Sequence, residues 1–138
     1  MIAYLDASVL LRQVLGEPEP LPQWSVLTRV VSSRLLAVES YRTLDRLRLD
    51  GRLNDPEVAE RRAVLTRLLR TIEWVELTES ILASATMPMP TVVGTLDAIH
   101  LVCALEWSKG TGLPLPMATH DRRMGEAARA LGLDVIGV

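Results

Sequence analysis

Short apolar runs with strand character alternate with longer stretches of helical character along the whole chain. The expected strands cover residues 2–5, 30–33, 72–77, 115–119 and 135–138, and the expected helices cover residues 7–15, 34–49, 56–70, 78–85, 95–107 and 124–131. Strands that alternate with helices form a mainly parallel sheet with helices on both faces. The sequence therefore predicts an α/β fold, a three-layer α/β/α sandwich around a mainly parallel central sheet.

The chain length sets the number of such units. A chain of 138 residues can bury one proper core but not two independent ones, so residues 1–138 are expected to form a single domain. No apolar run approaches the roughly 18 to 20 residues that a membrane span needs, and the first residues lack the basic stretch of a secretory signal. We therefore expect a cytoplasmic protein without a membrane association.

Four acidic residues lie in apolar surroundings, unlike the other acids of the chain. Asp6 and Asp121 follow expected strands, whereas Glu39 and Asp97 lie within helices that have apolar neighbours. Asp6 and Asp121 can each be explained as helix caps, and Glu39 can pair with a nearby arginine. If the four converge, however, two carboxylates about 4 Å apart repel by roughly 4 kcal/mol at an effective dielectric constant near 20. Such a cluster needs a cation.

The chemistry of this cation follows from the ligand set. All-oxygen ligands, without clustered cysteine or histidine, favour Mg²⁺ or Mn²⁺. The matching reaction is phosphodiester hydrolysis, in which the metal activates water and offsets developing negative charge. We therefore predict that four residues bind the metal and act in catalysis: Asp6, Glu39, Asp97 and Asp121. For Asp121 the alternative stays open that it is a helix cap and contacts the metal only indirectly.

Arginines give this acidic chain a means of contacting a phosphate backbone. The net charge of −2 is unfavourable for nucleic-acid binding, but the basic residues gather in clusters, and the planar arginine fork suits phosphate. Arg42 and Arg122 are the candidates for substrate contacts. The alternative is that these clusters are solvated helix faces, paired with acids such as Asp45.

The ordered set of motifs around these acids resembles the PIN-domain nucleases, and in particular the short VapC-type toxins of bacterial toxin–antitoxin pairs. The segments that carry the resemblance are residues 4–8, 36–42, 97–100 and 119–121. Asp6, Glu39 and Asp97 match the core metal-binding acids of that family. Asp121 matches the fourth acid, which acts through water or a second metal, and Ser8 and Thr119 match the hydroxyl positions beside the metal centre.

This resemblance also implies an activity and partners. It implies a Mg²⁺- or Mn²⁺-dependent endoribonuclease that cleaves structured RNA, of the tRNA or rRNA class, by metal-activated water. It further implies a homodimer that a cognate antitoxin inhibits within a heterotetramer or larger assembly. Two alternatives remain open within the same fold: an RNA-processing nuclease outside a toxin pair, and a non-catalytic interaction protein.

Other residues are less informative. A phosphoacceptor signalling domain would need a lysine late in the sheet, but the single lysine, Lys109, lies in a helix. His100 shares a helix face with Asp97 and is expected to be a structural hydrogen-bonding residue, whereas His120 is expected to be a solvated loop residue outside the catalytic set. Cys103 is expected to be buried as a small hydrophobic residue, and Trp107 to lie in the core or at a dimer interface.

Overall fold

The computed structural model describes all residues from 1 to 138 and contains one sheet of five strands. The strands are β1 (Ile2–Leu5), β2 (Arg29–Ser33), β3 (Ile72–Val75), β4 (Met117–Ala118) and β5 (Val135–Ile136). Their order in the sheet is β3-β2-β1-β4-β5, and every neighbouring pair is parallel. The predicted parallel sheet is therefore confirmed.

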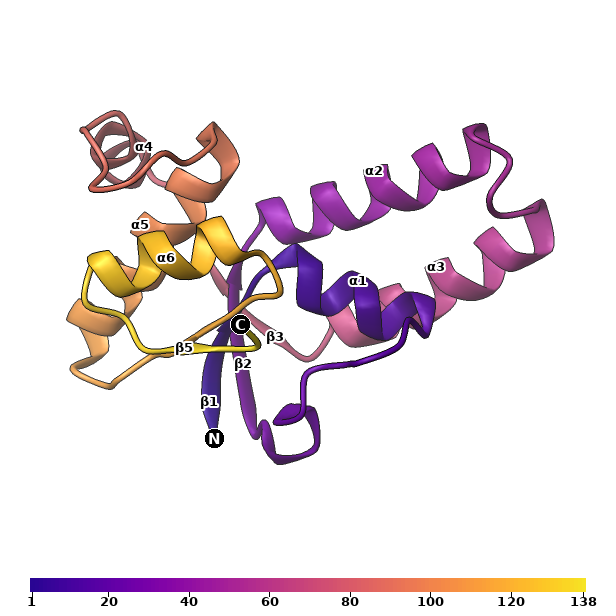
Figure 1. Cartoon of the computed structure of the whole chain (residues 1–138), viewed down its shortest axis with the longest axis horizontal. Helices are drawn as coiled ribbons and strands as arrows, with labels where there is room; N and C mark the ends of the chain where they lie inside the picture. The colour runs from indigo at the N-terminus through magenta and orange to yellow at the C-terminus, as the bar shows by residue number, and fades with distance from the viewer.

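Six helices cover the two faces of this sheet. They are α1 (Ala7–Leu15), α2 (Leu35–Leu49), α3 (Asp55–Leu69), α4 (Glu79–Ala85), α5 (Thr95–Thr111) and α6 (Arg122–Ala130), with a short 3₁₀ turn, η1 (Trp24–Val26), that the sequence did not predict. In Figure 1, α1, α2 and α3 lie to one side of the strands, and α4, α5 and α6 lie to the other. The three-layer α/β/α architecture is confirmed. None of these helices has the length and apolar character to cross a membrane.

Each face of the sheet has its own hydrophobic core, because side chains alternate between the faces along a strand. In β1, Ala3 and Leu5 point into the core that α1, α2 and α3 cover. Tyr4, between them, points into the core that α5 and α6 cover. All three are at most 1% exposed. β1 is thus the central strand in both senses, flanked by strands on both edges and by helices on both faces.

The ends of several elements differ from the sequence-based expectation. β3 ends at Val75 rather than at residue 77, because its partner strand β2 ends at Ser33, and Ser33 is paired with Val75. Beyond Ser33 the chain turns into α2, so Glu76 has no strand to pair with. α5 continues to Thr111 instead of residue 107 and ends where Gly112 adopts a left-handed φ of 69°.

The strand order creates a crevice at the centre of the sheet. From β1 the chain moves outward through β2 to β3 and then returns to the opposite side of β1 as β4. In open parallel sheets ligands bind beyond the carboxyl ends of the strands at such a point of reversal. Asp6 follows β1, and Asp121 follows β4 by three residues. The topology therefore brings these two acids to one crevice.

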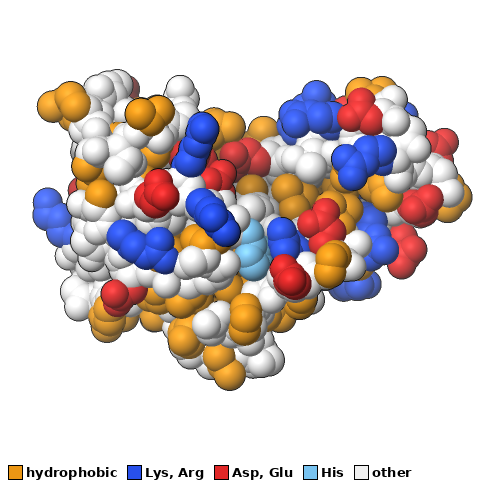
Figure 2. All heavy atoms as spheres, viewed as in Figure 1, with side chains coloured by type: hydrophobic (Ala, Val, Ile, Leu, Met, Phe, Trp, Pro, Cys, Tyr) orange, Lys and Arg blue, Asp and Glu red, His pale blue; other side chains and the backbone are white.

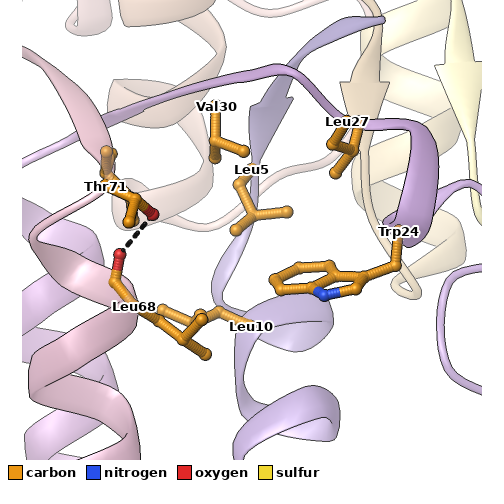
Figure 3. Close-up of a pocket in the computed structure, with 8 residues that line it drawn as sticks. Leu5, Leu10, Trp24, Leu27, Val30, Leu68 and Thr71 are labelled. Carbon is orange, nitrogen blue, oxygen red and sulfur yellow. Dashed lines mark hydrogen bonds between the residues drawn. The ribbon is translucent and has the colours of Figure 1, made fainter.

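A second hollow in the molecule is apolar and lies away from these acids. It has a volume of about 140 Å³ and is lined by eight residues, seven of them hydrophobic, among them Leu5, Leu10 and Trp24. Figure 3 shows Trp24 along one side of it and Leu68 and Thr71 on the other, with the Thr71 hydroxyl bonded to the Leu68 carbonyl. With no charged lining residue, it is a packing gap in the first core rather than a site for chemistry.

Candidate active site

Asp6 is the most enclosed acid of the chain, at 7% exposure, and both of its carboxylate oxygens accept hydrogen bonds. Its Oδ1 caps α1 by accepting the Ala7 N–H at 2.7 Å. Its Oδ2 accepts the Ser8 hydroxyl at 2.6 Å and the Thr119 hydroxyl at 2.8 Å. Asp6 is therefore a helix cap, as one reading of the sequence predicted, and also the centre of a hydroxyl cluster that a cap does not require.

The two hydroxyls join the loop after β1 to the loop after β4. The Ser8 Oγ accepts the backbone N–H of His120 at 2.9 Å, and the Thr119 Oγ1 accepts the backbone N–H of Asp121 at 3.0 Å. Each hydroxyl thus accepts from the β4 loop and donates to Asp6. The sequence assigned Ser8 and Thr119 to positions beside the metal centre, and their contacts hold the Asp6 and Asp121 loops together.

Asp121 begins α6 much as Asp6 begins α1. Its Oδ1 accepts the N–H groups of Arg123 at 2.8 Å and Met124 at 3.3 Å, which leaves Oδ2 without a protein donor. An aspartate at this position satisfies N–H groups that would otherwise lack a partner and complements the positive end of the helix dipole. One oxygen of Asp121 is therefore committed to the helix, and the other is available.

Glu39 reaches the same region from the second turn of α2. Its Oε2 lies 2.7 Å from Nε2 of His100, and its side chain is 21% exposed. The arginine partner that the sequence left open for Glu39 does not occur. A hollow of about 410 Å³ runs beside Glu39 and is also lined by Arg42, Arg46 and Leu96.

Asp97 lies in the first turn of α5, and its pKa reflects the charges of the other three acids. Burial raises the pKa of Asp97 above the usual aspartate value, and the charges of Asp6 and Asp121 raise it further; His100 acts in the opposite direction, and Glu39 again raises it. These charges act on Asp97 because helices from both layers bring the acids to the same end of the sheet. Figure 2 shows red carboxylates at the floor of a notch between the two halves of the molecule, with blue side chains at both rims.

The four acids do not form a closed ligand set. No three His, Cys, Asp or Glu side chains are close enough together to hold a metal ion. Two of the acids are paired with hydrogen-bond donors of the protein. Glu39 turns to His100, and Asp121 turns to its own helix. The donors are all oxygen and the local charge is negative, so the residues fit Mg²⁺ or Mn²⁺.

The two arginines singled out from the sequence lie in different surroundings. Arg42 lines the hollow beside Glu39; it is 68% exposed and its Nη1 lies 3.0 Å from Asp45, as the alternative reading of the arginine clusters predicted. Arg122 lines another hollow, of about 370 Å³, with Glu126 and Arg129 on the outer side of α6. Only Arg42 therefore shares a hollow with one of the four acids.

The two histidines differ from one another more than the sequence suggested. His100 is fully buried and makes structural hydrogen bonds, as expected, but one of its partners is the site acid Glu39. His120 is not simply solvated: Nδ1 lies 3.2 Å from the Gly137 carbonyl, and Nε2 is shielded from solvent without a partner. A pairing between residues 39 and 100 leaves no signal in a single sequence, because neither spacing nor periodicity reports contacts between helices on opposite faces.

The last strand supports the loop that carries Asp121. The Thr119 N–H donates to the Ile136 carbonyl at 3.0 Å. Gly137 has a φ of 102°, and a Cβ there would collide with the Thr119 carbonyl, so only glycine allows β5 to approach the loop this closely. This contact fixes the backbone of Thr119, whose side chain bonds to Asp6.

Comparison with known proteins agrees with this geometry. The chain matches the PIN domain family over residues 3–130 and therefore belongs to that family. Ribonuclease VapC46 of Mycobacterium tuberculosis (strain ATCC 25618 / H37Rv) is 32% identical over 133 residues, which cover 96% of this chain and 95% of that protein. The predicted resemblance to VapC-type PIN-domain ribonucleases is thereby confirmed.

A solved structure supports the fold independently. The crystal structure of PAE2754 from Pyrobaculum aerophilum superposes with a TM-score of 0.62 over 97% of this chain and 89% of that chain, at 18% sequence identity. At this level of identity the similarity concerns the fold alone. It supports the overall fold described above.

Proposed function

We propose that this protein is a Mg²⁺- or Mn²⁺-dependent endoribonuclease that hydrolyses structured RNA and acts as the toxin of a toxin–antitoxin pair. The observation that carries the proposal is that Asp6, Asp121 and Glu39, from three other segments of the chain, all raise the pKa of Asp97. Membership of the PIN-domain family and the similarity to a ribonuclease support the choice of nuclease chemistry.

The oxygens without a protein donor indicate how a cation would be held. They are Oε1 of Glu39, Oδ2 of Asp121 and the carboxylate of Asp97, whose raised pKa has only burial and neighbouring charges as causes. Asp6 would add its remaining lone pairs. When bound, a divalent cation supplies Lewis acidity, which lowers the pKa of water and offsets charge on a phosphate.

Hydrogen bonds from neighbouring residues hold Asp6 in a fixed orientation before substrate binds. The Ser8 and Thr119 hydroxyls fix the rotamer of Asp6 by two short hydrogen bonds. These bonds also keep the loops after β1 and β4 at a fixed separation, since each hydroxyl accepts a backbone N–H of the second loop. Preorganised acids do not have to reorient when the reaction begins, and this lowers the barrier.

Asp6→Asn tests the proposed chemistry. The variant keeps an oxygen for the Ala7 N–H but loses the charge, so cleavage of structured RNA should fall by at least about 10²-fold, comparable to the loss of other groups that stabilise transition-state charge. The measurement is the rate of cleavage of purified tRNA and rRNA in gel assays with Mg²⁺, Mn²⁺ or EDTA. Asp50→Asn, at an exposed α2 terminus, is the matched control. Equal cleavage by the parent and Asp6→Asn would contradict the proposal.

The guanidinium of Arg42 is proposed to contact an RNA phosphate on the rim of the notch. Arg42→Ala should raise KM severalfold, leave kcat nearly unchanged and reduce the salt dependence of RNA binding by about one phosphate contact. Arg67→Ala, on α3, removes the same charge without a contribution to this hollow and serves as the control. If both variants behave alike, Arg42 does not contact RNA and belongs to a solvated helix face, where its ion pair with Asp45 is its main interaction.

The toxin role separates this proposal from the two alternatives within the fold. The chain is proposed to act in the cytoplasm as a homodimer and to be inhibited by a cognate antitoxin in a heterotetramer or larger assembly. Its expression should arrest growth, and Asp97→Asn should relieve the arrest. Activity in vitro without arrest would favour an RNA-processing nuclease, whereas arrest that persists in Asp97→Asn would indicate an interaction protein without catalysis.

A further inference from the structure

A continuous chain of hydrogen bonds, buried except at its Glu39 end, links the central strand to one acid of the candidate site. The Tyr4 hydroxyl, on β1, lies 2.8 Å from Nδ1 of His100 on α5, and Nε2 of the same ring lies 2.7 Å from Oε2 of Glu39 on α2. Tyr4 and His100 are both 0% exposed. Ser33, at the end of β2, adds its Oγ at 3.3 Å from the same Nδ1. Three segments of the fold therefore meet at one imidazole.

The backbone fixes the direction of these hydrogen bonds. The Tyr4 oxygen accepts the Ser33 N–H at 3.0 Å, and the Ser33 Oγ accepts the Leu35 N–H at 3.2 Å. Each hydroxyl beside Nδ1 thus already accepts one hydrogen bond and has its own proton to donate. Burial raises the pKa of Tyr4 well above that of a free tyrosine, so this hydroxyl keeps its proton. The Glu39 carboxylate at Nε2 can only accept, and two hydroxyls with protons to donate lie beside Nδ1, so Nδ1 is the acceptor and the ring proton belongs on Nε2.

We infer that His100 is a positioning residue of the active site: Tyr4 and Ser33 set its tautomer, and its Nε2–H holds Glu39. Oε2 of Glu39 is committed to the imidazole, so Oε1 is the oxygen that remains free for a cation. This inference rests on the proposed function where it concerns metal binding, but the tautomer of His100 follows from the buried hydrogen bonds alone.

Ordinary core packing does not account for this arrangement. An apolar side chain would fill the same space without needing three polar partners, and burying an imidazole is unfavourable unless both nitrogens are satisfied. Both nitrogens of His100 are satisfied, whereas Nε2 of His120 is shielded and unpaired. A histidine that orients a carboxylate near a metal is the mirror of the common arrangement in which a carboxylate orients a metal-bound histidine.

The tautomer is measurable in metal-free protein by long-range ¹H–¹⁵N correlation NMR, because the chain has only two histidines. The variant His120→Asn assigns the two rings. The inference expects the neutral Nε2–H form for His100 in the parent and an increased share of the Nδ1–H form in Tyr4→Phe, which keeps the ring and removes only the hydroxyl. A proton on Nδ1 of His100 in the parent would overturn the inference.

Metal binding tests the consequence for Glu39. Mn²⁺ affinity, measured by calorimetry or electron paramagnetic resonance, should fall by about 10- to 100-fold in His100→Leu, the range seen when a group that orients a ligand is lost. His100→Gln, whose amide offers Glu39 a donor, should recover part of that affinity. Val102→Ala, a buried position on the same helix with no bond to Glu39, controls for a loosened core. Unchanged affinity in both His100 variants would overturn the positioning role.

Two further outcomes keep this test apart from that of the proposed function. If the parent binds no Mn²⁺, the proposed function fails, while the NMR measurement still decides the tautomer. If His100→Leu does not fold, Tyr4→Phe and Ser33→Ala replace it, since each removes one hydroxyl donor to Nδ1. Weaker Mn²⁺ binding in those variants supports the positioning role of His100. An Mn²⁺ affinity equal to that of the parent in both variants overturns it.

Discussion

The surroundings of Asp97 disfavour the ionised form of its carboxyl group. It is half-buried, it gains no hydrogen bond that would favour its charged form, and Asp6, Asp121 and Glu39 all raise its pKa. The folded chain thus holds a proton on Asp97 more tightly than the unfolded chain does. Stability is therefore greatest at low pH for this group and is lost as pH rises through its raised pKa.

Asp97→Asn should raise the melting temperature of the metal-free protein at pH 7. The amide removes a charge that the folded state disfavours, and each kcal/mol relieved raises Tm by about 4 °C in a domain of this size. The measurement is thermal unfolding by circular dichroism in EDTA. At a pH below the usual aspartate value of 3.8, where Asp97 is protonated in both states, the difference should vanish. A variant that is less stable than the parent at pH 7 would contradict this account.

The acids of the candidate site could be predicted from the sequence, but the contacts of the two histidines could not. The four acids were predicted as a group because each stands in apolar surroundings, and in the structure the charges of Asp6, Asp121 and Glu39 raise the pKa of Asp97. The sequence did not predict the bond between Glu39 and His100, since 61 positions separate them and their helices lie on opposite faces of the sheet. The contact of His120 was not predicted either, because its partner, Gly137, comes just after the last strand.

At the scale of elements, two helices begin at site acids, and this gives each acid two roles. Asp6 caps α1, and Asp121 caps α6. The positive end of each helix dipole also lies beside the acid and partly offsets its charge. The strand–acid–helix pattern was visible in the sequence, so the positions of both acids could be predicted, whereas the length of β3 could not, because it depends on where its partner strand ends.

Two substitutions at Asp121 should separate its roles. Asp121→Asn retains an oxygen for the N–H groups of Arg123 and Met124, so stability should change little while Mn²⁺ affinity falls. Asp121→Ala loses the cap as well and should cost about 1 kcal/mol in the free energy of unfolding. Urea unfolding and Mn²⁺ titration measure the two effects. Unchanged Mn²⁺ affinity in Asp121→Asn would assign this residue to the cap alone.

At the scale of the whole molecule, two cores of twelve buried residues each share one sheet, and the first of them borders an apolar gap. The gap of about 140 Å³ lies between α1, α3 and η1, in the core opposite Tyr4 and His100. Trp24, on the turn that the sequence did not predict, lines it. The predicted three-layer order was correct because apolar periodicity reports which faces are buried, but periodicity does not report how well they are filled.

Val30→Ile should stabilise the protein by adding a methyl group to this gap. The expected gain is about 0.5–1 kcal/mol in the free energy of unfolding, within the range for cavity-filling substitutions. Urea unfolding at neutral pH provides the measurement. Val102→Ile, in the second core and outside the lining of this gap, is the control and should destabilise or have no effect. A loss of stability in Val30→Ile would show that the gap cannot accept the methyl group.

Under the proposed function Mn²⁺ should stabilise the whole fold, because a cation that binds the folded chain and not the unfolded one shifts the unfolding equilibrium. At a concentration of about 100 times Kd, binding adds roughly 2.7 kcal/mol to the free energy of unfolding. Thermal unfolding with and without Mn²⁺ measures this gain, and Asp6→Asn should lose most of it. An equal shift in the parent and the variant would mean that Mn²⁺ acts elsewhere on the surface.

The parallel pairing of β1 with β4 has a consequence for when, during synthesis of the chain, the proposed site can form. Asp6 is made within the first residues of the chain, but Thr119, which bonds to it, follows 113 positions later. A chain still on the ribosome, synthesised only as far as α4, would contain Asp6 and Glu39 but neither Asp97 nor the β4 loop. Translation therefore nearly finishes before the acids of the proposed site can assemble, and a product terminated before α5 should lack nuclease activity.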